Sequence, residues 1–401
     1  MLQSILSGDL PRSRVLSVAL IAILIALALG PFLFPGTRAF ATLGMICVFI
    51  IVVAAYDLML GYTHIVSFAH TMFFGIGAYG VALGIGHFGS GFGAIFIGIL
   101  GALLLSAALA LLLGLLSLRV KAIFFALVTL AVAFAFLSVV TQMYHITGGE
   151  DGLRVRVPRE LGPAFRPLDS VTGFDLFGFL GVLFTQPWNL VDGFRDAFFT
   201  VRFTGRTLMY YALFLFAGVI FLFLLRLVNS PFGRVLQAIR ENEFRAQALG
   251  YRTVLYRTAV VILSALLTTF AGALFALFNR YVNPENTLNF ELMIFILLMC
   301  VLGGMGTLYG AIIGAVVFVV AQNYLQDVLG ALSEAVNVGG FVGSLIEPSH
   351  WLLWFGLLFV ASVYFFPSGI VGQLRIWARR REVQQAVAER QAESSARERL
   401  T

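Results

Sequence analysis

Charged side chains are scarce in this chain. They make up only 11% of its 401 residues, while hydrophobic residues make up 60%, and a soluble domain usually has about a quarter charged residues. No soluble core could hide this much apolar surface, and lipid is the natural solvent for it. The scarcity of charge therefore excludes an ordinary soluble protein and predicts a protein embedded in lipid.

Cysteine and intramembrane carboxylates are scarce too. Cys47 and Cys300 both fall inside apolar stretches, so we expect neither a disulfide nor a metal site. Asp57 lies at the edge of one apolar stretch and Glu291 at the start of another, whereas proton- or sodium-coupled carriers keep ionisable groups within the membrane. With no recognisable nucleophile–base pair or cofactor motif, the sequence predicts a pathway without its own energy source, not an enzyme, and no cofactor.

Roughly ten apolar stretches approach the length of about 20 residues that a membrane span needs. They are residues 15–34, 39–56, 61–86, 92–118, 122–144, 207–225, 258–279, 292–302, 307–326 and 349–366. The third and the eighth look short or broken. We therefore predict an all-α polytopic membrane protein of about ten transmembrane helices. A cleaved signal peptide stays open as an alternative for the first stretch, although that stretch is longer than the usual apolar region of a signal peptide, roughly 7–15 residues.

Arginine and lysine predict the orientation, because they concentrate in cytoplasmic loops. They occur before the first span, at 119–121, at 229–257 and in the tail at 373–401. Ten spans with both termini in the cytoplasm satisfy these positions and make residues 1–372 one transmembrane domain. Residues 145–206 then form an outer loop, which serves either as a docking or interfacial surface or as a plain insertion. The basic tail is expected near anionic lipid, and no feature indicates nucleic-acid binding.

Glycine and polar residues interrupt the apolar run at 61–80, GYTHIVSFAHTMFFGIGAYG. One interpretation is a broken helix whose polar groups line a water-filled pathway. The other is a tightly packed helix pair, since glycine and serine also permit close packing. The pattern alone favours neither, and the spacing of His64 and His70 does not suit a metal pair. The candidate pathway residues here are Gly61, Ser67, His70, Thr71, Gly75, Gly77 and Tyr79.

A second glycine cluster, VLGGMGTLYGAIIGA, occupies residues 301–315. Gly303, Gly304 and Gly306 predict a turn between two short spans. The cluster lacks the lysine of a phosphate-binding loop and follows no strand, so we reject nucleotide binding. Two broken segments in different halves of a polytopic chain also suggest a site between them, and these glycines join the candidate pathway.

The third notable stretch is SPFGRVLQAIRENEFRAQALGY, residues 230–251. Ser230 followed by proline predicts a helix start, Asn242 can cap a second short helix, and Gly250 can end it. A structured cytoplasmic loop of this length suggests that a partner binds there, although a soluble flap without a partner is the simpler alternative.

Six stretches together resemble the permease subunits of branched-chain amino acid ABC importers, in particular the member of the permease pair with the longer outer loop. They are the three stretches above, LRVKAIFFALVTLA from residue 118, ITGGEDGL from residue 146 and FPSGIVG from residue 366. The resemblance is collinear from about residue 40 to 372 and includes the whole set of motifs.

The resemblance implies a multi-pass subunit of the bacterial inner membrane that imports branched-chain or related amino acids. It implies a second permease subunit, two cytoplasmic ATPase subunits, a periplasmic substrate-binding protein and the lipid bilayer as partners. The residues that it places in the ATPase-coupling loop are Arg240, Glu241, Asn242, Glu243, Ala246 and Gly250.

Two alternatives stay open at this point. One is a urea or short-chain amide permease of the same superfamily, which differs in the substrate of its binding protein. The other is a stand-alone secondary carrier, which would need an intramembrane coupling residue. Asp57 is the candidate for that role.

Overall fold

Apolar runs form helices in this protein because a helix satisfies its own backbone hydrogen bonds, which hydrocarbon cannot do. The computed structural model describes residues 14–34, 36–116, 122–166, 171–175, 198–201, 203–336, 347–366, 368–374 and 377. Within them, eight helices are long and apolar enough to cross a membrane, and two shorter apolar helices are Val15–Ala28 and Pro348–Ser362. Each predicted span falls on one of these helices, which confirms the all-α polytopic class. The cytoplasmic location of the termini stays a prediction.

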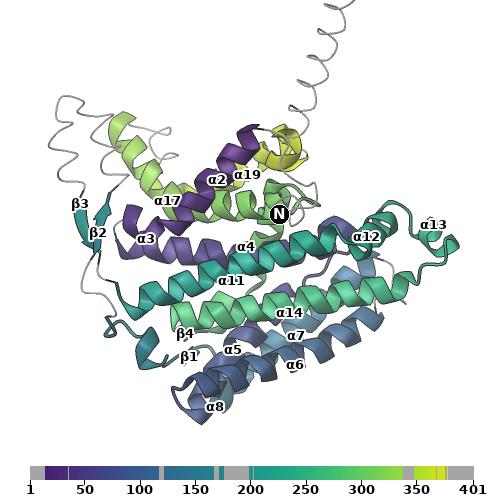
Figure 1. Cartoon of the computed structure of the whole chain (residues 1–401), viewed down its shortest axis with the longest axis horizontal. Coiled ribbons are helices and arrows are strands. Elements are labelled where there is room, and N and C mark those ends of the chain that lie inside the picture. The colour runs from purple at the N-terminus through teal and green to yellow at the C-terminus, as the bar shows by residue number, and fades with distance from the viewer. Residues whose placement is uncertain are drawn as a thin grey trace, which may run out of the picture.

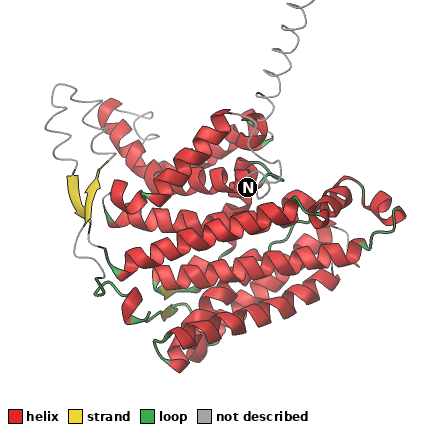
Figure 2. Ribbon diagram, in the orientation of Figure 1, coloured by secondary structure: helices red, strands yellow, loops and turns green. Residues whose placement is uncertain are grey.

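The long helices lie roughly side by side in the bundle (Figures 1 and 2). They are α4 (Thr37–Thr63), α5 (His70–Phe88), α6 (Phe92–Leu116), α7 (Ala122–Gln142), α11 (Gly205–Val228), α14 (Thr253–Asn279), α17 (Leu308–Val336) and the span Pro284–Gly303, most of which is α16 (Phe290–Gly303). The shorter elements beside them are α2 (Arg14–Ala28), α3 (Gly30–Leu33), α15 (Pro284–Thr287), η3 (Pro348–His350) and α19 (Trp351–Phe365). At one end lie α12 (Pro231–Glu241) and α13 (Glu243–Ala248), and at the other lie α8 (Tyr144–Thr147), β1 (Leu153–Arg154) and β4 (Tyr281–Val282).

Helix α4 is the centre of the bundle. Protein buries 94% of its most apolar stretch, compared with 28% for α6 and 22% for α7. The exposed sides of α6 and α7 are apolar, as Phe96, Leu104 and Phe124 illustrate. Exposed apolar side chains of this kind suit lipid or another membrane subunit rather than water.

Glycines bring α5 against both of its main neighbours. A Cβ atom on Gly77 would overlap the Thr269 carbonyl of α14, and one on Gly272 would overlap the Phe74 carbonyl of α5. On the other side of α5, Gly98 of α6 has no room for a Cβ atom beside the Gly80 carbonyl. The helices therefore touch backbone to backbone, which small residues permit. Part of the glycine pattern at 61–80 thus serves helix packing.

Backbone hydrogen bonds hold the ends of the outer loop that follows α8. Strand β1 pairs antiparallel with β4, and the Val155 N–H donates to the Arg280 carbonyl (2.9 Å). Farther along, the Gly205 N–H donates to the Phe165 carbonyl (3.0 Å), so the two stems of the outer loop meet. Before Phe165, η1 (Arg159–Leu161) packs on α11. After it, β2 (Val171–Phe174) pairs with β3 (Phe198–Val201). Residues 167–170, 176–197 and 202 of the predicted outer loop, the loop at 117–121 and almost all of the basic tail lie outside the described residues.

The glycine contact predicts a specific sensitivity. We expect Gly77→Ala to lower the free energy of unfolding by about 1–3 kcal/mol, because α5 and α14 must separate to admit the methyl group. The measurement is thermal unfolding of the full chain in detergent. Gly218→Ala in α11 is the matched control, since nothing lies within 4 Å of its added Cβ. Equal melting temperatures for the two variants would contradict the packing role.

Candidate functional site

The chain folds back on itself after α4. Helix α4 ends at Thr63, His64 adopts a left-handed conformation (φ 53°), and α5 begins only at His70. The His70 ring lies against Tyr56, with 4.7 Å between the ring centroids, so the residues between return along α4. Irregular backbone at membrane depth persists only where protein buries it or where it lines a cavity. The predicted break therefore exists, and it lies at residues 64–69.

One side chain from α7 and one from within the segment satisfy backbone N–H groups of this re-entrant segment, residues 64–69. The Phe68 N–H donates to Thr129 Oγ1 of α7 (3.0 Å), and the Ala69 N–H donates to Ser67 Oγ (3.2 Å). These two bonds replace those that a continuous helix would have supplied. The segment is thus fixed to α7 by a hydroxyl inside an apolar span.

His70 connects the start of α5 to α14 and α4. Its Nε2 lies 2.8 Å from Ser264 Oγ, and Ser264 Oγ donates to the Ala55 carbonyl (2.5 Å). Since the one hydroxyl proton of Ser264 goes to Ala55, His70 Nε2 is the donor in the first bond. The predicted pathway residues Ser67, His70, Thr71 and Tyr79 are all buried. All four side chains therefore lie inside this subunit, although Tyr79 is more than two helical turns along α5 from His70.

A buried carboxylate holds the second glycine cluster. Asp57 is 1% exposed, and its Oδ1 accepts hydrogen bonds from the Gly306 N–H (2.7 Å) and the Cys300 thiol (3.4 Å). The other oxygen, Oδ2, has no hydrogen-bond partner among the described residues. A Cβ atom on Gly61 would overlap both Asp57 Oδ1 and the Gly306 nitrogen. Position 61 must therefore be glycine for α4 to pack against the backbone at Gly306.

The predicted turn is confirmed, but the span after it is not short, because α17 has 29 residues. Helix α16 ends at Gly303 and α17 starts at Leu308, while Gly304 (φ 116°) and Gly306 (φ 76°) take conformations that favour glycine. The closing turn of the sequence packs here, because a Cβ atom on Gly369 would overlap the Gly304 Cα. We call residues 304–306 the glycine turn.

The two predicted loop helices are confirmed as α12 and α13. The Ser230 hydroxyl accepts from the Gly233 N–H (3.5 Å), and Asn242 Oδ1 accepts from the Arg245 N–H (3.0 Å). Gly250 (φ 88°) ends the second helix in a turn. These caps satisfy the free N–H groups at the helix starts, so the loop is a folded element.

Arg240 points inward from this loop to the other two stretches. Its Nε donates to His64 Nε2 (3.2 Å), and its guanidinium lies where a Cβ atom on Gly306 would be. His64 is exposed beyond the end of α4. Partial burial and then the charge of Arg240 lower the pKa of His64, which favours the neutral ring that accepts this bond. All three stretches that the sequence singled out thus meet at the α12 end of the bundle.

The other predicted loop residues take different positions. Glu243 forms an ion pair with Arg257 of α14 (3.1 Å), and Ala246 is buried under the loop. Glu241, Asn242 and Gly250 are exposed. The most exposed apolar side chains of the loop are Phe244 (84%) and Leu249 (70%), neither of which the sequence had singled out.

Sequence reasoning also missed the hydroxyls that join helices. Besides Thr129 and Ser264, Thr269 Oγ1 of α14 donates to Ser106 Oγ of α6 (2.6 Å). Each is a serine or threonine in an otherwise apolar run, which is a visible signal because a buried hydroxyl needs a partner. The sequence does not show which partner each one finds.

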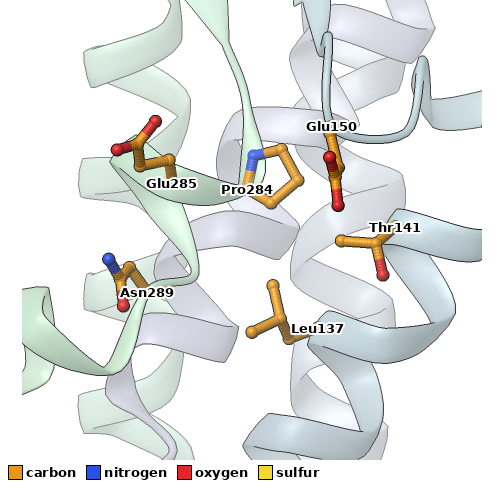
Figure 3. Close-up of a pocket in the computed structure, with 6 residues that line it drawn as sticks. All are labelled: Leu137, Thr141, Glu150, Pro284, Glu285 and Asn289. Carbon is orange, nitrogen blue, oxygen red and sulfur yellow. The ribbon is translucent and has the colours of Figure 1, made fainter.

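A small polar pocket lies at the opposite end of the bundle. It has a volume of about 270 Å³ and lies between α7 and α15. Glu150 and Thr141 lie on one side, with Glu285 and Asn289 on the other (Figure 3). Among the described residues no group of three or more His, Cys, Asp or Glu side chains is placed to hold a metal ion.

Comparisons with known proteins identify similar sequences. Residues 38–363 match the family described as branched-chain amino acid transport system, permease component. The high-affinity branched-chain amino acid transport system permease protein LivM of Escherichia coli (strain K12) is 30% identical over 326 residues, 80% of this chain and 71% of the relative. Its Salmonella typhimurium counterpart is 29% identical over the same shares. No solved structure matches the chain.

The re-entrant segment yields a local prediction. We expect Thr129→Val to speed hydrogen exchange at the Phe68 amide and to lower the free energy of unfolding by about 1–3 kcal/mol, because the amide loses its acceptor. Thr268→Val is the matched control, since the Thr268 hydroxyl donates only to a carbonyl of its own helix. Hydrogen-exchange mass spectrometry of both variants is the measurement, and unchanged exchange at residues 64–69 in Thr129→Val would contradict the anchor.

Proposed function

The chain belongs to the family of branched-chain amino acid transport permease components, and we propose that it forms half of an ATP-driven import pathway in the bacterial inner membrane. It is a multi-pass membrane protein and the permease subunit of a branched-chain amino acid importer. The family match over residues 38–363 is the observation that carries this conclusion. A second permease subunit completes the pathway, and a periplasmic binding protein delivers the substrate at the β1 end.

The α12 end faces the cytoplasm in this proposal. The loop at 229–257 contains five arginines and two glutamates, and positive charge in loops between spans favours the cytoplasmic side. The ten apolar helices then place both termini on that same side, and ATP hydrolysis occurs on separate subunits that bind this loop.

The exposed end of α13 is the contact for an ATPase subunit. Phe244 and Leu249 project from a small folded loop whose buried side is fixed by Ala246 and by the Glu243–Arg257 ion pair. An exposed aromatic side chain on a rigid element is the usual form of an interface anchor. The polar residues beside it, Glu241 and Arg245, suit the rim of such an interface.

The secondary-carrier alternative loses its candidate residue in this arrangement. Asp57 is engaged by the Gly306 N–H and the Cys300 thiol, and it lies beside the glycine turn. The carboxylate is thus a hydrogen-bond partner of an irregular loop, which accounts for its presence in the membrane without a coupled ion.

The main test is reconstitution in proteoliposomes with candidate ATPase subunits, a second permease subunit and a binding protein. We expect binding protein loaded with leucine, isoleucine or valine to stimulate ATP hydrolysis and uptake. Stimulation by urea or a short amide instead would move the substrate to the amide class. Uptake of leucine against a gradient without nucleotide would contradict the ATP-driven mechanism.

The contact residue has its own test. We expect Phe244→Ala to weaken binding of the ATPase subunits by roughly 30-fold. This equals a loss of about 2 kcal/mol in binding free energy, which is typical when a hot-spot side chain is truncated. Phe165→Ala is the control, since this exposed phenylalanine lies at the other end of the bundle. The measurement is the affinity of the ATPase subunits for the chain embedded in nanodiscs. Equal affinities of the two variants would rule out α13 as the anchor.

A further inference from the structure

Arg240 connects the loop that we assign to the ATPase with the two broken segments of the membrane domain. We propose that Arg240 and Asp57 form a transmission pair. When α12 moves, Arg240 moves the re-entrant segment and the glycine turn with it. In the alternative state of the permease, the Arg240 guanidinium leaves His64 and pairs with Asp57 Oδ2. This inference rests on the proposed function only in taking the α12–α13 loop as the place where the ATPase acts.

The glycine turn is held from both sides. From within the bundle, Asp57 Oδ1 accepts the Gly306 N–H (2.7 Å). From the loop side, the Arg240 guanidinium lies directly against Gly306 and donates to His64 at the start of the re-entrant segment (3.2 Å). A displacement of α12 therefore acts on both segments at once, because one side chain contacts both.

The buried carboxylate is only half satisfied. Asp57 Oδ2 is buried and has no hydrogen-bond partner among the described residues, although the Arg240 guanidinium is close enough to interact with this carboxylate electrostatically. A buried carboxylate oxygen without a donor is unfavourable. Asp57 Oδ2 is a stronger acceptor for Arg240 than His64 is, because a charge-assisted hydrogen bond is stronger than one to a neutral ring.

Two glycines pack closely beside Asp57 in this state. The Gly61 Cα and the Gly306 nitrogen lie so close to Asp57 Oδ1 that no side chain would fit between them. In the alternative state, the glycine turn shifts relative to α4 and the Arg240 guanidinium pairs with Oδ2. The guanidinium then has two discrete arrangements, one on His64 and one on Asp57, which is the kind of two-state element that transmits a local displacement.

The test uses the full importer in proteoliposomes. For Arg240→Gln we expect assembly with the ATPase subunits to stay within roughly twofold of the parent chain, while uptake and the stimulation of ATP hydrolysis by loaded binding protein fall about tenfold or more. Arg234→Gln is the matched control, because Arg234 is an exposed arginine on the same helix. We expect it to retain stimulation.

A double-mutant cycle tests the pairing with Asp57. If Arg240 and Asp57 act together, Asp57→Asn combined with Arg240→Gln reduces stimulation little more than either change alone, because each already removes the pair. Where Arg240→Gln lowers the yield of folded chain, Arg240→Lys replaces it, since lysine keeps the charge and loses the planar fork.

Three results would overturn the inference. The first is that ATP hydrolysis in Arg240→Gln is stimulated to within about twofold of the parent. The second is that Arg240→Gln loses assembly as much as Phe244→Ala does. The third is that the fold-reductions from the Arg240 and Asp57 substitutions multiply in the double variant, as they do for independent sites. Failure of the parent chain to assemble with any ATPase subunit would instead contradict the proposed function. The two failures are therefore distinguishable.

Discussion

Unpaired backbone polar groups are the constraint on which this architecture depends. In a membrane they cannot turn to water, so each interruption of a helix requires a donor or acceptor from elsewhere in the chain. Thr129 supplies it for the re-entrant segment and Asp57 for the glycine turn. Each break is consequently anchored to a neighbouring helix, the re-entrant segment to α7 and the glycine turn to α4.

The rest of the bundle divides into a rigid centre and an apolar exterior. Helices α4, α5 and α14 are mostly buried, and glycines at their contacts bring backbone against backbone. Hydroxyls such as Thr269 and Ser264 add hydrogen bonds between helices. A centre joined in this way resists internal change, so the parts available for movement are the irregular segments that end near Arg240.

The sequence predicted the features that depend on local chemistry. Apolar length gave the spans, and Ser230, Asn242 and Gly250 gave the two loop helices. The glycine clusters indicated both breaks, although a pattern at 61–80 could not distinguish packing from pathway, since both need small residues. The contacts of Asp57 were out of reach, because its partner Gly306 is 249 residues away and no local rule links them. The pathway role of residues 61–80 and 303–306 stays a prediction.

The hydrogen bond between the Phe165 carbonyl and the Gly205 N–H closes the base of the long connection after β1. Chain that leaves and returns at one fixed point adds little entropic cost when it lengthens, about 0.6 kcal/mol for each doubling. Insertions and deletions at this place are therefore nearly neutral for the bundle beneath. Relatives of this protein are free to diversify what they present beyond that junction while retaining the same transmembrane machine.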